Sequence, residues 1–590
     1  MFLTIPVTGT VDLTTIDLLV FRLDDANLST LLGALAANNL PAAGAAFALL
    51  EKYTEDDFVP AIGTGAIKLL PKKPLSPGAS YAVVVHSTLM DGNGNLVQSG
   101  LTMEALKQTT PFGPDSPFLD FEAVRAKYND DVSPTEPALF TVTQGVTAVA
   151  NGGIPWTRVD TLVLWTFQTA DRTLSLTPTT PGSETTPYPD VIDPFALTTG
   201  SFKTLSAGVD HSDTLMWIDP TGVNPPAATN PVGLPAAAIF SQYGIPAPNY
   251  LENIYFGYFD SPEFATCGAT SDSVTFLLTV PSGIKPAGGW PVVVFQHGIT
   301  SSKNAALPLA DTLAGAGYAT LAIDAPFHGD RKLPDPAKSG DGFFTANLIQ
   351  DRANIYQAAL DLWETVDLVD ANVVDFDGVA GGDLYTGNIQ FVAHSLGSII
   401  GSVFLSQEGR VDKMVLSSPS AILVNVLDQT ALPDLQALVG SLGYIKGTTP
   451  YYVFLNLAQW LLDPADSSYN GIGIPIGNST DNLLTVMAYD DPIVSTDSTR
   501  VFLTNIDLDP ADIVPVDPDL IGGPFPPPLA GAYEYGVANK PIVHSFLLSP
   551  VINLVTDPWY QGYLQVDQDN ATTGAQTQVG DFLFLALPPP

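Results

Sequence analysis

The chain has 590 residues, and its 61 acidic residues against 22 basic ones give a formal net charge of −39. This length, with 45% hydrophobic residues, predicts a folded globular protein with more than one domain. A surface this acidic repels phosphate backbones and anionic bilayers, so nucleic acid is excluded as an expected partner.

The cysteine count and the length of the hydrophobic runs further limit the classes of protein to which this chain can belong. Cys267 is the only cysteine, so no intrachain disulfide can form, and we expect a buried, inert thiol. No run of about 18 apolar residues occurs, which argues against a transmembrane segment. Residues 1–10 lack the basic start and apolar core of a signal peptide, so we expect that an upstream export signal has been removed.

Residues 1–175 are predicted to form a β-rich domain. Its candidate strands are 18–23, 66–70, 81–86 and 161–167, and its candidate helical inserts are 27–53 and 118–127. The segment 67–95 resembles bacterial immunoglobulin-like modules, because proline-leucine, proline-glycine and tyrosine positions precede a strand that an Asp/Gly/Asn turn follows. We therefore expect an all-β immunoglobulin-like sandwich. The turn at Asp91 lacks the later ligands of a calcium loop, and a plain turn is the favoured interpretation.

Residues 176–270 are rich in Pro, Thr, Ser and Gly and have little periodicity. We interpret them as a connecting region with a hairpin near 254–259. His211 in this region and His86 in the first domain are expected to be hydrogen-bonded structural histidines.

Residues 271–590 are predicted to form the catalytic domain. Short apolar strands alternate with longer helical segments from Val274 onward, which is typical of a mostly parallel sheet with helices on both faces. The expected strands are 274–280, 291–295, 319–323, 389–393, 413–417 and 483–488, and the expected helices are 304–314, 343–369, 396–406 and 576–585. Open sheets of this kind place their sites at the carboxyl ends of the strands.

Residues 421–480 interrupt the alternation with apolar helical stretches at 431–442 and 451–462. Two interpretations are open for this insertion. It packs against the sheet as ordinary structure, or it forms a cap whose apolar face lines an acyl-chain pocket.

Residues 387–403 indicate a strand, a sharp turn at Ser395 and a helix packed by small residues, the layout of an α/β-hydrolase nucleophile elbow. The residues two before and two after the serine must be small, and they are Ala393 and Gly397. The alternative is a serine that only caps the helix N-terminus.

A serine nucleophile needs a base and an acid that orients the base, in the chain order Ser, Asp or Glu, His. Of the six histidines only His544 follows the elbow, since the side chain of His394 should project away from the nucleophile. Asp491, directly after the strand 483–488, is the predicted acid. Asp490 and, more weakly, Asp466 are the alternatives, and each could also be a turn or cap aspartate.

Two backbone N–H groups must stabilise the oxyanion that forms during acyl transfer. We predict that they belong to Leu396, at the start of a helix, and to Ile299, in the loop after the first core strand. His297 and His328 are expected to stabilise loops. The scattered histidines and the single cysteine predict neither a metal site nor a cofactor.

With these motifs named, the sequence resembles the bacterial extracellular lipase family that carries an N-terminal immunoglobulin-like virulence-factor lipase domain and includes surface-exposed lysophospholipases. The matching segments are 289–300, 322–331, 391–399, 463–466 and 544–545, with a weaker likeness at 163–169. The resemblance implies an α/β-hydrolase fold, an extracellular or cell-surface location, an ester substrate with an acyl chain and no redox cofactor. Ala393 stands where such lipases more often carry glycine.

The leading hypothesis is a serine carboxylic-ester hydrolase, a lipase or carboxylesterase that acts on a small-molecule or lipid ester through Ser395, His544 and Asp491. Phospholipid or polyester substrates would use the same mechanism. The other hypotheses are a serine peptidase, which would cleave amides, and a non-catalytic surface adhesion protein, which would not react with a fluorophosphonate.

Overall fold

The computed structural model describes residues 3–6, 10–63, 66–71, 75–76, 79–114, 116–130, 137–169, 214–264, 270–379, 381–406, 408–446, 448–471, 474, 482–520 and 530–584. The chain divides into two compact units. The smaller contains Phe2–Arg172 with Lys446–Tyr452, and the larger contains Met1, Thr173–Ile445 and Val453–Pro590. The expectations for His211 and Cys267 lie outside the described residues.

The smaller unit is built on a four-stranded antiparallel sheet in the order β4-β3-β7-β9. Its strands are β3 (Leu18–Arg22), β4 (Lys52–Thr54), β7 (Ser80–His86) and β9 (Thr161–Gln168). A three-stranded sheet of β1 (Leu3–Pro6), β6 (Ala66–Pro71) and β5 (Phe58–Gly63) and a short pair of β2 (Val11–Asp12) and β8 (Met90–Asp91) complete the strands described there.

The two faces of the four-stranded sheet are covered differently. Along β3, Leu18 and Val20 pack in a core that includes Ile67 and Leu69 of β6, while Leu19 and Phe21 pack against helices. The helices are α1 (Ala26–Ala36), α2 (Leu40–Leu49), α3 (Leu101–Leu106), α4 (Glu122–Asn129) and α5 (Leu139–Ala150). The helical inserts expected at 27–53 and 118–127 are present as α1, α2 and α4, and the helices α3 and α5 were not expected, so the described part of this unit is not all-β. Immunoglobulin-like topology stays a prediction.

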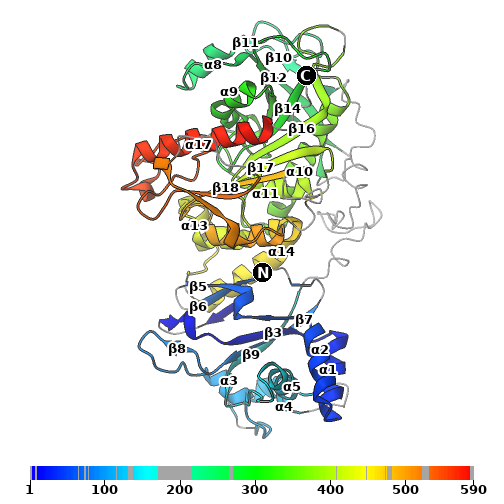
Figure 1. Ribbon diagram of the computed structural model, residues 1–590, viewed down its shortest axis with the longest axis vertical. Coiled ribbons are helices and arrows are strands. Elements are labelled where there is room, and N and C mark those ends of the chain that lie inside the picture. Colours follow the sequence, from blue (N-terminus) through cyan, green and yellow to red (C-terminus); the bar gives the residue numbers. More distant parts are fainter. Residues whose placement is uncertain are drawn as a thin grey trace. The chain divides into compact units, whose positions relative to one another are not determined.

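The larger unit contains an 11-stranded sheet in the order β10-β12-β13-β15-β14-β16-β17-β18-β20-β19, with β11 paired to β12 (Figure 1). Its strands are β10 (Met216–Ile218), β11 (Leu234–Pro235), β12 (Leu251–Pro262), β13 (Ser271–Pro281), β14 (Trp290–Gln296), β15 (Ala319–Ile323), β16 (Leu384–His394), β17 (Val411–Ser417), β18 (Leu483–Ala488), β19 (Val514–Val516) and β20 (Gly531–Tyr535). The strands from β15 to β19 along this order are parallel, and β10, β11, β12 and β13 pair antiparallel.

Helices accompany this sheet on both faces, as expected for parallel strands that are buried throughout. They are α8 (Ala236–Gln242), α9 (Leu307–Gly315), α10 (Leu348–Asp370), α11 (Leu396–Leu405), α16 (Thr496–Asn505) and α17 (Gln565–Phe584). The segment 421–480 adds α12 (Leu423–Gln429), α13 (Pro433–Ser441), α14 (Thr449–Leu462) and α15 (Ser467–Asn470). No helix among the described residues is long and apolar enough to cross a membrane.

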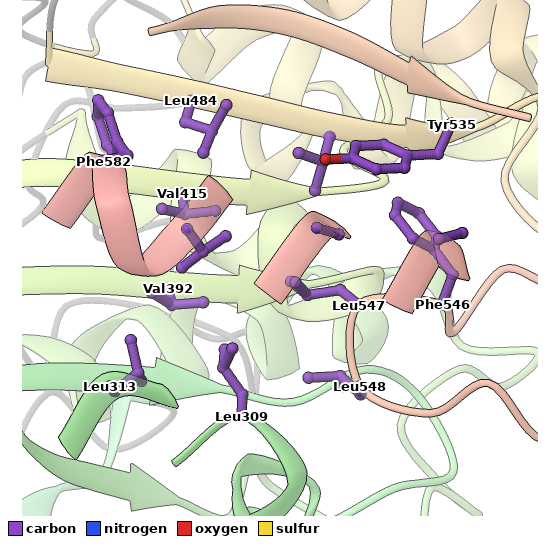
Figure 2. Close-up of a cluster of buried hydrophobic side chains, with 14 of the residues drawn as sticks. Leu309, Leu313, Val392, Val415, Leu484, Tyr535, Phe546, Leu547, Leu548 and Phe582 are labelled. Carbon is purple, nitrogen blue, oxygen red and sulfur yellow. The ribbon is translucent and has the colours of Figure 1, made fainter. Parts of the chain in front are cut away.

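Successive side chains along each strand point to opposite faces of the sheet, so each face packs against its own set of helices. Figure 2 shows Val392 of β16, Val415 of β17 and Leu484 of β18 packed with α9 and α17. Phe391, the neighbour of Val392 on β16, points to the other face and meets Phe404 of α11 with ring centroids 5.2 Å apart. The helix α11, which begins directly after β16, is thereby held against the sheet.

The segment expected only to connect the two domains contributes to this sheet. β12 pairs with β13 from Pro262 back to Leu251, and α8 packs in a core with Ile254, Leu277 and Leu307. The predicted connecting region is thus wrong for residues 214–264. Local periodicity missed it because β12 carries apolar residues on both faces and is interrupted by Gly257.

Candidate active site

The turn at Ser395 has the strained geometry that exposes a nucleophile. Ser395 follows β16 directly, and its backbone adopts φ 56° and ψ −123°, a conformation that residues other than glycine rarely adopt. Its N–H donates to the carbonyl of Ser417 on the neighbouring strand at 2.8 Å. The helix α11 begins at the next residue. This is the strand, turn and helix layout that the sequence predicts.

Close backbone approach explains the small residues around the elbow. A Cβ placed on Gly397 would lie 2.4 Å from the carbonyl oxygen of Gln296, so no larger residue fits without moving β14 or α11. A Cβ on Gly298 would lie 3.0 Å from the Cβ of Ser395. Ala393 is fully buried at the end of β16. Both glycines therefore bring the loop after β14 against the nucleophile.

Adjacent strands end at the same edge of the sheet with the same local strain. Positive φ angles occur at Thr300 after β14, Ser395 after β16, Ser418 after β17 and Asp490 after β18, with values of 62°, 56°, 47° and 51°. Strain of this kind clusters where function requires a particular side-chain direction. The edge at the carboxyl ends of β14, β16, β17 and β18 is therefore the candidate site.

Asp491 and His544 meet at this edge. Asp491 lies three residues after β18 and is 7% exposed, and its Oδ2 accepts a hydrogen bond of 2.6 Å from His544 Nδ1. The other oxygen, Oδ1, accepts from the backbone N–H groups of Ile493 at 2.9 Å and Val494 at 3.1 Å. These two donors hold the carboxylate in place.

The opposite nitrogen of His544 is free for chemistry. With Nδ1 engaged by Asp491, Nε2 is buried and has no hydrogen-bond partner among the described residues. No hydrogen bond joins it to the Ser395 hydroxyl in the part of the chain described, a common state of unliganded sites, where such bonds are long. The ring of His394, next to Ser395, lies 4.8 Å from the ring of His544. The backbone of His544 is anchored from α17's side of the sheet by Tyr560, whose hydroxyl accepts from its N–H at 3.0 Å.

The two alternative acids have other positions. Asp490 is exposed, and its positive φ places it in the turn after β18. Asp466 is fully buried, but its oxygens accept from the backbone N–H of Ile422 at 2.9 Å and from Gln459 Nε2 at 2.9 Å. Of the three candidate acids, the structure brings only Asp491 to His544.

The two predicted oxyanion donors border the same space as Ser395. Ile299 and Leu396 both line the cavity that Ser395 lines. Within the described residues neither backbone N–H donates a hydrogen bond. A carbonyl oxygen in this cavity would therefore find two unused donors, one of them at a helix N-terminus.

The remaining histidines of this region have structural contacts. His297 Nδ1 donates to the carbonyl of Gly298 at 2.8 Å and Nε2 accepts from the N–H of Ala325 at 3.1 Å, which ties the loop after β14 to the loop after β15. Burial lowers the pKa of His297 and lowers the pKa of His328 to about 4. Burial, with the nearby His544, holds the pKa of His394 well below its ordinary value, so this ring stays neutral.

An apolar cavity of about 470 Å³, open space included, adjoins the serine. Among the described residues, Ser395 supplies the only hydroxyl in this lining, which otherwise consists of Ile299, Phe344, Leu396, Ile399, Leu423, Val426, Leu427, Leu432, Leu435, Leu462, Ile493 and Val494. Six of these lie between 421 and 480, so that insertion lines the pocket beside Ser395. An apolar chain fits this lining, whereas a charged group would lose its hydration there.

One acidic group among the described residues could be mistaken for a metal site. The carboxylates of Asp375, Asp377 and Asp383 lie close together. Lys285 forms ion pairs with two of them, because its Nζ lies 2.7 Å from Asp377 and also contacts Asp383. The turn at Asp91 likewise satisfies itself, since its Oδ1 accepts from the N–H groups of Asn93 and Asn95, each at 2.8 Å.

Three contributors to the site were not predicted from the sequence. Ser418 donates its hydroxyl to Asp491 Oδ2 at 3.3 Å, Tyr560 anchors the backbone of His544, and Phe344 lines the cavity. Ser418 follows an apolar strand in the same way as Ser395, and that position was a usable signal. Nothing in the local sequence distinguishes Tyr560 or Phe344 from core aromatics.

Comparison with known proteins agrees with this topology. A family model for the alpha/beta hydrolase fold matches residues 291–442, from β14 to α13, and the larger unit has the α/β-hydrolase fold. No curated protein sequence matches the chain significantly.

Solved structures similar to this chain include several esterases. An acetyl xylan esterase from Paenibacillus sp. R4 is 16% identical, with 53% of this chain and 84% of that chain covered and a TM-score of 0.32. Acetyl xylan esterase 1 from Thermoanaerobacterium sp. JW/SL YS485 is 17% identical, with 46% and 86% covered and a TM-score of 0.30. An esterase from Pyrococcus furiosus is 16% identical, with 47% and 84% covered and a TM-score of 0.26. Likenesses this distant carry no information about substrate.

Proposed function

We propose that the protein is a serine carboxylic-ester hydrolase. The observation that carries this proposal is the 2.6 Å contact between His544 Nδ1 and Asp491, which leaves the buried Nε2 without a partner at the sheet edge where Ser395 occupies its strained turn. A neutral imidazole oriented in this way is a general base for a hydroxyl.

The reaction follows from the roles of these atoms. His544 Nε2 takes the proton of the Ser395 hydroxyl as the oxygen attacks the ester carbonyl, and Asp491 stabilises the imidazolium that forms. The N–H groups of Ile299 and Leu396 donate to the oxyanion. His544 then gives its proton to the departing alcohol, and water, activated by the same base, releases the acid from Ser395.

The cavity lining supports an apolar acyl group as the part of the substrate held beside Ser395. Lipid esters, including lysophospholipids, are the substrate class that the sequence resemblance adds to this proposal. Polyesters are an alternative substrate class that the same mechanism would cleave. An extracellular or cell-surface location also belongs to the proposal and depends on the same resemblance and on the acidic composition.

The test removes the nucleophile. We expect Ser395→Ala to lower the turnover of p-nitrophenyl butyrate by at least about 10³-fold and to abolish labelling by a fluorophosphonate, because triad members act as a unit. The matched control is Ser282→Ala, an exposed serine in the turn after β13. Retained turnover in Ser395→Ala would overturn the assignment. Cleavage of the corresponding anilide at a comparable rate would favour a peptidase instead.

A further inference from the structure

Asp466 is a fully buried carboxylate that the proposed reaction does not use. Its Oδ1 accepts hydrogen bonds from the backbone N–H groups of Ile422 at 2.9 Å and Ser468 at 2.7 Å. Its Oδ2 accepts from Gln459 Nε2 at 2.9 Å and from the N–H of Leu423. Four donors from three segments therefore converge on one side chain.

These donors place Asp466 at the junction of three helices. Ile422 and Leu423 stand at the start of α12, Gln459 belongs to α14, and Asp466 itself caps α15. Gln459, also fully buried, extends the junction, because its Oε1 accepts from the N–H of Val424 at 3.1 Å. The first amides of α12 are thus satisfied by side chains that lie more than thirty residues further along the chain.

The start of α12 needs this support. Ile422 has φ 64°, a left-handed conformation that is strained for a β-branched residue and persists only where surrounding bonds impose it. The N-terminal amides of a helix carry partial positive charge, so a carboxylate is a better acceptor there than a neutral group.

The helices that meet at Asp466 also line the cavity. Leu423, Val426 and Leu427 of α12 and Leu462 at the end of α14 belong to its lining. A further bond connects the junction to the nucleophile helix, since the hydroxyl of Ser402 on α11 donates to that of Ser467 at 2.8 Å. The carboxylate therefore fixes the backbone of one cavity wall relative to the helix that begins after Ser395.

We propose that Asp466 is a positioning residue for substrate selection, which holds the α12 and α14 wall of the cavity in place and so confers a preference for esters with longer apolar acyl groups. This inference rests on the proposed ester hydrolysis. An acetyl group is too short to depend on that wall, whereas an octanoyl chain beside Ser395 would contact it.

The experiment compares acyl-chain selectivity per active site. In Asp466→Asn an NH₂ group replaces one acceptor oxygen and faces N–H donors, so the start of α12 is released. We expect kcat/KM for p-nitrophenyl octanoate to fall by about tenfold or more relative to that for p-nitrophenyl acetate, the range seen when apolar pocket contacts are lost. Acetate turnover should stay within about threefold of the wild-type value. Active sites are counted with a fluorophosphonate, so misfolded protein does not enter the rates.

Two further variants make the result decisive. Gln459→Leu removes the acceptor of Val424 and one donor to Asp466 and should shift the ratio in the same direction by a smaller factor. Asp434→Asn, an exposed acid on α13, is the matched control and should leave the ratio unchanged. If Asp466→Asn has no titratable active sites, Gln459→Leu decides the question.

Each outcome has a separate meaning. An unchanged ratio, or an equal loss for both esters, would overturn the positioning role while leaving the ester hydrolase intact. Retained ester turnover in Ser395→Ala would instead overturn the proposed function itself.

Discussion

At the scale of single residues, the candidate site depends on which hydrogen-bond donors each of the two carboxylate oxygens of Asp491 accepts from. Oδ1 of Asp491 is taken by two backbone N–H groups, and only Oδ2 is left for Ser418 and His544. The carboxylate therefore imposes a tautomer on His544, with the proton on Nδ1 and the lone pair on Nε2. Asp490, one residue earlier, has no such arrangement.

Replacing Asp491 by asparagine should reverse this tautomer. The amide oxygen would stay with the N–H groups of Ile493 and Val494, so the NH₂ group would face His544 Nδ1 and leave the proton on Nε2. We expect kcat for p-nitrophenyl butyrate to fall by about 10⁴-fold, the size of effect known for a wrongly protonated triad histidine. Asp490→Asn is the matched control and should lose less than about threefold. A larger loss in Asp490→Asn than in Asp491→Asn would assign the acid to the neighbouring residue.

At the scale of elements, the parallel strands β14 to β18 follow from the sequence, because each is an apolar run bounded by turn residues. The parallel strands β19 and β20 were not among the predicted ones, because β19 has only three residues with Pro515 at its centre and β20 contains Gly531 and Glu534. The strand 319–323 has the predicted bounds, and 483–488 does as well. Ser395 and Asp491 could be found because they follow such strands, whereas His544 was found by elimination, because it is the only histidine after the elbow. Polar or β-branched segments were harder. α5 is rich in Thr and Val, and α17 was predicted to begin at 576 although it begins at Gln565, since its buried Gln568 and Gln578 bond to Val543 and Tyr535 in tertiary contacts that no local pattern reveals.

The insertion 421–480 shows the same limit of sequence-based prediction. An apolar helix that packs in a core and one that lines a pocket have the same composition, so the sequence alone does not separate these two roles. A prediction at this scale concerns α13, whose Leu435 lines the cavity. Leu435→Trp should fill part of the cavity and lower kcat/KM for p-nitrophenyl octanoate by about tenfold or more, while the acetate ester stays near its wild-type rate. Ala437→Trp, an exposed position on the same helix, controls for the added bulk. If Leu435→Trp leaves the ratio of kcat/KM for the octanoate ester to that for the acetate ester at its wild-type value, the acyl chain lies elsewhere.

At the scale of the whole molecule, basic residues are few, and several of them each form ion pairs with two acidic residues. Lys303 contacts both Asp324 and Asp330, Arg331 contacts Asp272 and Asp361, and Lys540 contacts Asp517 and Asp519. Each cation neutralises buried or clustered acids locally, but the chain as a whole keeps its charge of −39. Repulsion among the remaining acids opposes the folded state, since unfolding separates them.

This imbalance predicts how salt affects stability. At neutral pH, raising NaCl from about 0.01 M to about 1 M shortens the Debye length from about 30 Å to about 3 Å and should raise the midpoint of thermal unfolding, because it screens more repulsion than attraction. Near pH 4, close to the isoelectric point of about 4.1, the net charge vanishes and the same salt should change the midpoint much less. Scanning calorimetry at both pH values measures the two shifts. A midpoint that falls with salt at neutral pH would mean that the shared ion pairs outweigh the repulsion, and that the acidic surface is organised for cohesion within each unit.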